Sequence, residues 1–127
     1  MELTKEAIDL IETIAEKSGK YKREAYLFMF EALEYTLRKL NERRHVTGQE
    51  LLQGISEFGK SEYGPMTKTV FEYWGVTKTE NFGRIVFDLV EAGLMGKTES
   101  DSIEDFKDGY DFDEEFVQSY KSNSKRP

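Results

Sequence analysis

Residues 79–116 read TENFGRIVFDLVEAGLMGKTESDSIEDFKDGYDFDEEF, and this stretch decides the expected fold. Its first half carries apolar residues at positions i, i+3, i+4, i+7 and i+8, the spacing of one helix face. These residues are Phe82, Ile85, Val86, Leu89 and Val90. Gly93 ends the run, so a helix over residues 79–93 is predicted. Nine carboxylates and a single lysine follow within residues 99–115, and they form a strongly acidic segment with aromatic residues between the charges.

Apolar periodicity predicts four further helices before this stretch. They are expected over residues 4–18, 23–43, 47–62 and 65–74. The second carries the broadest apolar stripe and is expected to be the central, most buried helix. The third has the most specific start signal, because Thr47 and Glu50 form a capping box in which each side chain binds a backbone N–H of the first turn. Gly64-Pro65 separates the third helix from the fourth.

The last three helices come in the order found in a winged helix-turn-helix. Residues 94–95 and 110–112 are expected to be strands of a small hairpin, and residues 113–120 a last helical turn. The predicted fold is therefore mainly α, a compact bundle of about five helices with a winged-helix-like C-terminal half and at most a small β-hairpin. Residues 1–120 are expected to form one domain and residues 121–127 a disordered tail.

Composition narrows the class of protein. The 127 residues suit one domain, and the frequent Phe and Tyr residues predict an aromatic-rich core. Because there is no cysteine, disulfides and thiolate metal sites are excluded. No apolar run reaches the roughly 18–20 residues that a membrane helix needs, and the opening residues MELTKEAIDLIE lack a basic segment followed by an apolar one. The chain is expected to be cytoplasmic, with no membrane partner.

The net charge of −7 is unevenly distributed. Residues 1–60 hold ten Lys and Arg against eleven Asp and Glu, whereas residues 61–127 hold eight against fourteen. Nucleic acids bind through cations that neutralise phosphates. The acidic C-terminal half therefore disfavours nucleic acid as a partner.

Residues 54–61 read GISEFGKS and match the P-loop pattern of nucleotide-binding proteins. A P-loop needs free backbone N–H groups between a strand and a helix, but the capping box at Thr47 and the following apolar spacing place these residues inside a helix. Glu57 would also face the phosphates. Nucleotide binding here is kept as the less favoured alternative, and no cofactor is predicted.

The single histidine, His45, forms no cluster and suits a structural or solvent-exposed role beside a helix end. The acidic run resembles an EF-hand loop in part: when Gly109 is aligned with the loop glycine, Glu115 takes the twelfth position, but Phe106 occupies the third, where an oxygen ligand is needed. Weak calcium binding is kept as a less favoured interpretation. No metal site and no catalytic group is predicted, so the protein is expected not to be an enzyme.

Aromatic residues alternate with the carboxylates of the acidic segment, which leaves two interpretations. The rings either anchor a protein partner or pack back on the helices, since aromatic residues mark interfaces and cores alike. The favoured function is a protein-interaction module that binds an unknown, basic protein partner through this surface. The predicted partner-binding residues are Asp105, Phe106, Asp108, Tyr110, Asp111 and Phe112.

The alternative function is a winged-helix DNA-binding regulator. Its contacts would come from Arg84 on the third helix of the module and from the basic stretches at residues 20–23, 38–39 and 43–44. The acidic residues Glu80 and Asp88 on the same helix oppose this interpretation.

The chain also resembles a conserved hypothetical family of small bacterial cytoplasmic proteins over nearly its whole length. The resemblance lies in residues 26–40 (YLFMFEALEYTLRKL), 45–52 (HVTGQELL), 64–75 (GPMTKTVFEYWG) and 81–112 (NFGRIVFDLVEAGLMGKTESDSIEDFKDGYDF). It implies no catalytic or cofactor-binding residue.

Overall fold

The computed structural model describes residues 3–42, 44, 46–96 and 103–118. Five α-helices form within these residues: α1 (Lys5–Ser18), α2 (Arg23–Leu40), α3 (Gly48–Tyr63), α4 (Thr67–Tyr73) and α5 (Thr79–Glu91). Three shorter segments are also helical: the 3₁₀ turns η1 (Gly64–Met66) and η2 (Ile103–Phe106), and the π-helix η3 (Asp113–Gln118). The prediction of a mainly helical protein is confirmed.

Local signals set the ends of the helices. The Thr4 hydroxyl accepts a hydrogen bond from the Ala7 N–H at 3.0 Å and caps the start of α1. The predicted capping box of α3 is present, with the Glu50 N–H bound to the Thr47 hydroxyl at 3.1 Å and the Thr47 N–H bound to the Glu50 carboxylate at 2.9 Å. α2 ends earlier than predicted, because Asn41 adopts the left-handed conformation with φ of 56°.

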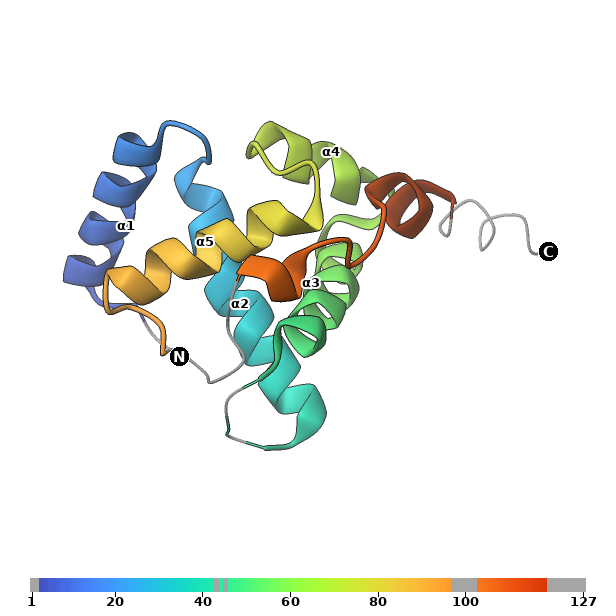
Figure 1. Ribbon diagram of the computed structural model, residues 1–127, viewed down its shortest axis with the longest axis horizontal. Helices are drawn as coiled ribbons and strands as arrows, with labels where there is room; N and C mark the ends of the chain where they lie inside the picture. Colours follow the sequence, from blue (N-terminus) through green and yellow to red (C-terminus); the bar gives the residue numbers. More distant parts are fainter. Residues whose placement is uncertain (1–2, 43, 45, 97–102, 119–127) are drawn as a thin grey trace.

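α2 is the central helix of the bundle, as its broad apolar stripe predicted. It packs against α1, α3 and α5. Figure 1 shows α5 crossing α2, with α1 at one end of the molecule and α4 above α3. All-round packing explains why α2 buries residues on more than one face, including Tyr26, Phe28, Met29 and Phe30.

The core is rich in aromatic side chains, which confirms the prediction from composition. Phe71 on α4 is fully buried, and several rings surround it with centroids between 5.3 and 5.9 Å from its own. These rings belong to Phe28, Trp74, Phe82, Phe112 and Phe116. Residues from α2, α4, α5 and the stretch 112–116 therefore share one core.

The expected hairpin is wrong where the structure describes it. Leu94, Met95, Tyr110 and Asp111 are irregular, Phe112 is helical, and no strand forms within the described residues. The physical reason is that residues 110–112 bind helices through side chains instead of pairing their backbone with a neighbouring strand. The helical turn expected over 113–120 forms as the π-helix η3 (Asp113–Gln118), and residues 119 and 120 lie outside the described residues.

Candidate acidic interaction surface

Residues 103–118, called here the C-terminal segment, carry all the predicted partner-binding residues. The segment begins with η2, which contacts α5 and α3, and ends with η3, which contacts α4 and α3. In Figure 1 it runs in orange and red from the middle of α5 to the far end of α3. Three helices thus position the segment.

Glycines let the segment lie directly on the helix backbones. A Cβ at Gly83 of α5 would stand 2.9 Å from the ring of Phe106, and a Cβ at Gly48 of α3 would stand 2.8 Å from the Cβ of Asp105. Within the segment, a Cβ at Gly109 would lie 2.5 Å from the Leu52 side chain. Cβ atoms do not approach this closely, so a larger residue at Gly48 or Gly83 would displace the segment, and one at Gly109 would displace the end of the Leu52 side chain.

The aromatic rings of the segment point into the core. Phe106, Phe112 and Phe116 are exposed by only 2%, 4% and 0%. Phe112 and Phe116 are in edge-to-face contact with centroids 5.1 Å apart, and Phe112 lies 6.0 Å from Phe82 of α5. Burial of these rings holds the segment against the bundle through the hydrophobic effect.

Tyr110 joins the segment to α3 through its polar end. Its hydroxyl donates a hydrogen bond to the Leu52 carbonyl at 2.9 Å, while the neighbouring Gly109 N–H donates to the Thr79 hydroxyl at 3.0 Å. Burial, and the nearby Glu115 carboxylate, raise the pKa of Tyr110. The phenol therefore stays neutral and keeps its donor at physiological pH.

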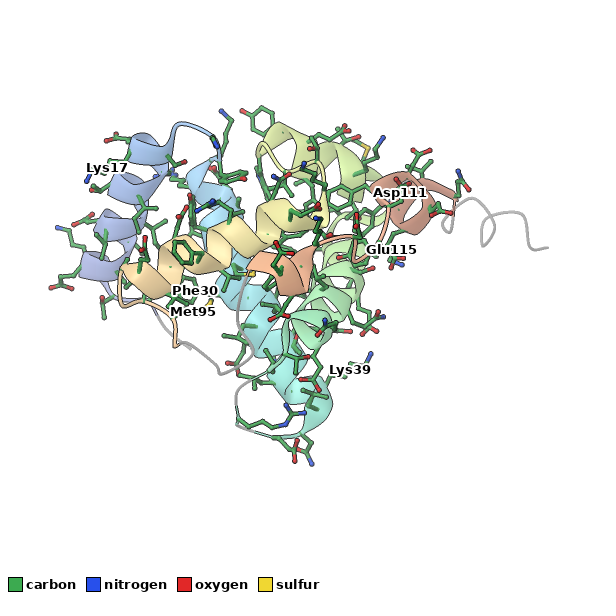
Figure 2. The ribbon with its side chains drawn as sticks, viewed as in Figure 1. Lys17, Phe30, Lys39, Met95, Asp111 and Glu115 are labelled. Carbon is green, nitrogen blue, oxygen red and sulfur yellow. The ribbon has the colours of Figure 1, made fainter. Side chains whose placement is uncertain are left out.

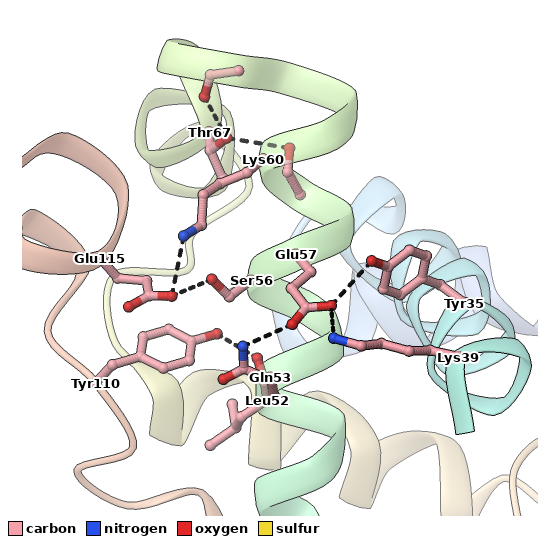
Figure 3. A network of polar contacts seen from close by, with 12 residues as sticks. Tyr35, Lys39, Leu52, Gln53, Ser56, Glu57, Lys60, Thr67, Tyr110 and Glu115 are labelled. Atoms are coloured by element: carbon pink, nitrogen blue, oxygen red, sulfur yellow. Dashed lines mark hydrogen bonds and ion pairs between the residues drawn. The ribbon is translucent and has the colours of Figure 1, made fainter. Parts of the chain in front are cut away.

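Two ion pairs hold the end of the segment on the helices, and Figure 3 shows the one between Glu115 and Lys60. The Glu115 carboxylate accepts a hydrogen bond from the buried Ser56 hydroxyl and lies 3.3 Å from Lys60 Nζ, both on α3. Asp113 lies 3.4 Å from Lys68 Nζ on α4. Glu115 and Asp113 thus hold η3 against α3 and α4, and the lysines partly balance their negative charges.

Other carboxylates of the segment face solvent. Glu104, Asp108, Asp111 and Glu114 are all exposed. A hollow of about 440 Å³ opens between this part of the segment and the start of α5. It is lined by Thr77, Lys78, Glu80, Asp108, Tyr110, Asp111, Phe112 and Glu114. Four carboxylates and one lysine give this lining a net negative charge. Figure 2 labels Asp111 near the start of η3.

The structure separates the six predicted residues into two groups. Asp108, Tyr110, Asp111 and Phe112 line the acidic hollow, whereas Asp105 and Phe106 lie against α3 and α5 outside it. Phe106 and Phe112 are core residues and not exposed anchors. Of the two interpretations that the sequence left open for the rings, packing on the helices is the one that the structure shows.

The P-loop-like residues lie inside α3, as the capping box predicted. Their two glycines have packing roles: a Cβ at Gly54 would lie 1.8 Å from Thr36 Oγ1 of α2, and one at Gly59 would lie 2.9 Å from the Phe71 ring. Lys60 pairs with Glu115. The glycine spacing that resembles a phosphate loop thus reflects the close approach of α3 to α2 and α4.

The calcium interpretation gains no support from the described geometry. No group of three His, Asp or Glu side chains among the described residues is placed to hold a metal ion. His45 lies outside those residues. No helix formed by the described residues is both long and apolar enough to cross a membrane.

Several cations considered for DNA binding are paired with carboxylates. Arg23 pairs with Glu12 and Glu24, Lys39 with Glu57, and Arg44 with Glu42 and Glu50. Arg84 is exposed and lies 5.5 Å from the centroid of the Phe87 ring. Paired cations attract phosphate less than free ones do, and Arg23 and Lys39 lie at opposite ends of α2.

Sequence reasoning missed the residues that receive the segment. Ser56, Lys60 and Thr79 bind it directly, but each stands in a helix whose sequence gives no sign of a partner more than 25 residues away. Gly54 and Gly59 were visible as unusual residues within a predicted helix, and they could have indicated close helix packing.

Comparison of the chain with protein-family models, curated proteins and solved structures gives no match.

Proposed function

We propose that this protein is a non-enzymatic, cytoplasmic interaction module that binds a basic protein partner at the acidic hollow. The hollow is defined by Asp108, Asp111, Glu114 and Glu80, with Lys78 beside them. The proposal rests on a difference between two groups of side chains in the C-terminal segment. The buried aromatic rings and Glu115 contact the helices. The carboxylates of Asp108, Asp111 and Glu114 at the hollow are exposed to solvent.

Rigidity supports this function. A flexible acidic tail would lose conformational freedom on binding, but a segment already held by buried rings and side-chain hydrogen bonds loses less. Asp111 illustrates the point, because its carboxylate accepts a hydrogen bond from the Glu114 N–H at 3.0 Å and so has a defined position at the start of η3. The Asp111 carboxylate is therefore preorganised for a cation.

The hollow suits a lysine or arginine side chain. Its lining supplies the carboxylates of Glu80, Asp108, Asp111 and Glu114, which can pair with an ammonium or a guanidinium group. Exposed charges contribute mainly to specificity and to the rate of encounter. We therefore expect binding that weakens steeply with ionic strength.

The test uses a fluorescent arginine- and lysine-rich peptide as the probe, with anisotropy measured from low to moderate salt. Asp108→Asn, Asp111→Asn and Glu114→Gln are combined in one variant, which keeps side-chain size and removes three charges. Binding by the wild type and its loss in the variant support the proposal. The matched control combines Asp9→Asn, Glu6→Gln and Glu16→Gln on α1, where the side chains are also exposed.

Equal loss in both variants would show only a response to net charge, and this result would contradict a specific site. No binding by the wild type at low salt would contradict the function itself. Thermal unfolding of each variant confirms that the comparison is made between folded proteins.

A further inference from the structure

A small cavity lies at the junction of α2, α3, α5 and η2, away from the acidic hollow. Its volume is about 160 Å³. Its walls consist mainly of Leu33, Leu37, Val46, Leu51, Val86 and Phe106. Five of these six side chains are buried, whereas Arg44 and Gly96 of the lining are exposed, so the cavity has apolar walls and a rim that meets solvent.

The polar groups at the cavity already have partners. Arg44, the charged residue of the lining, makes two hydrogen bonds to the Glu50 carboxylate at 3.0 and 3.1 Å and pairs with Glu42 at 2.7 Å. The Thr47 hydroxyl accepts the capping hydrogen bond from the Glu50 N–H. The arginine charge is thus balanced by protein carboxylates, and an anionic ligand would have to displace them.

Size and polarity together define what the cavity can hold. A buried water needs two to four polar partners, which these apolar walls do not offer. An apolar cavity of about 150 Å³ engineered in another protein stays dry and takes up benzene or xenon. We propose that the cavity of this protein binds an uncharged, apolar molecule about the size of one aromatic ring.

The first test is a titration of the full chain, isotope-labelled at its methyl groups, with benzene and with xenon. The expected result is a saturable shift of the methyl signals of Leu37, Val46 and Val86. Benzoate serves as the comparison, because it has the same ring but carries a charge that Arg44 cannot accept without losing Glu50 or Glu42. We expect no saturable shift with benzoate, and equal binding of benzoate and benzene would contradict the proposed ligand class.

The second test fills the cavity. Val86→Ile adds one methylene to the wall, and one methylene in a hydrophobic pocket changes affinity by about tenfold or more. Val90→Ile is the matched control, because it makes the same change on the same helix at a residue that does not line the cavity. Val46→Ile fills the cavity from a different element and replaces Val86→Ile if that variant does not fold.

Weaker benzene binding in Val86→Ile or Val46→Ile, together with unchanged binding in Val90→Ile, supports the proposal. Two results would overturn it: absence of saturable binding of benzene and xenon to the wild type, or wild-type affinity in both filled variants. Neither result bears on the acidic hollow, since the two sites share no lining residue.

Discussion

Glycine has an unusual role in this protein, because several glycines lie where two elements touch and not in turns. Gly54 is the clearest case. It sits in the middle of α3, where alanine would favour the helix by about 1 kcal/mol. The contact with Thr36 favours glycine here, since a Cβ at residue 54 would lie 1.8 Å from Thr36 Oγ1 and 3.0 Å from Thr36 Cβ, and Thr36 or α2 would have to shift.

We therefore predict that Gly54→Ala destabilises the protein, by about 1–3 kcal/mol, despite its better helix propensity. The measurement is urea-induced unfolding followed by circular dichroism. In the double variant Gly54→Ala with Thr36→Ala, the loss of the hydroxyl relieves part of the overlap, so the two changes should cost less together than their sum. Strict additivity would contradict the contact, as would a stabilised Gly54→Ala protein.

The charge of Glu50 provides a second prediction at the scale of single residues. Hydrogen bonds from Arg44 and from the Thr47 backbone N–H lower the pKa of Glu50 from 4.5 to about 2. Folding thus favours the ionised carboxylate, and its contribution to the free energy of unfolding is complete above about pH 4.5 and is lost as the pH falls towards about 2.

In Glu50→Gln the capping box is kept, because glutamine also accepts the Thr47 N–H, but the charge is removed. We expect the stability difference between wild type and this variant to be constant near neutral pH and to shrink below about pH 4.5. Chemical unfolding at a series of pH values measures it. A difference that does not depend on pH would contradict the ion pair with Arg44, and Glu16→Gln on α1 serves as the control.

At the scale of elements, the C-terminal segment is held by side chains and not by backbone pairing. Its rings enter the core, and its polar groups reach Leu52, Ser56 and Thr79 on two helices. A segment attached in this way depends on the shape of the surface that receives it. The bare backbone at Gly83, against which Phe106 packs, is part of that shape.

Gly83→Ala should therefore loosen η2 while α5 stays helical. The expected result is faster amide hydrogen exchange in residues 103–118, with little change in α1, because a local opening needs less free energy than global unfolding. Hydrogen exchange followed by mass spectrometry gives this comparison in one experiment. Uniform acceleration across the chain would instead indicate global destabilisation and would contradict local attachment at Gly83.

At the scale of the whole molecule, the C-terminal segment completes the core of the bundle. Phe112 and Phe116 cover Phe71, and Phe112 also covers Phe82. Without the segment, large apolar rings of α4 and α5 would meet water, and burial of one such side chain contributes roughly 1.5–3 kcal/mol. The loss of several rings is comparable with the entire stability of a small domain.

A chain ending at residue 102 should thus lack a cooperative thermal transition, whereas a chain ending at residue 118 should unfold like the full protein. Differential scanning calorimetry of both chains tests this expectation. A cooperative transition of unchanged midpoint in the shorter chain would show that the helices form a complete core without the segment.

The helices themselves followed from the sequence alone. Their number, their order and most of their ends were predicted, because apolar periodicity, the capping groups Thr4 and Thr47 and the terminating Gly19 act between residues a few positions apart. Interactions between residues a few positions apart can be recognised from the sequence without knowledge of the fold. The acidic character of the C-terminal segment was evident for the same reason.

The tertiary structure decided which side of that segment faces the protein. Alternating rings and carboxylates fit an exposed anchor and a core element equally well, and the choice depends on Gly83, Phe71 and Leu52, which are distant in sequence from the rings they meet. The expected hairpin was wrong for a related reason, since strand pairing competes with side-chain contacts that only the folded bundle supplies. Helix extent is a local property, whereas exposure and close approach are properties of the packed molecule.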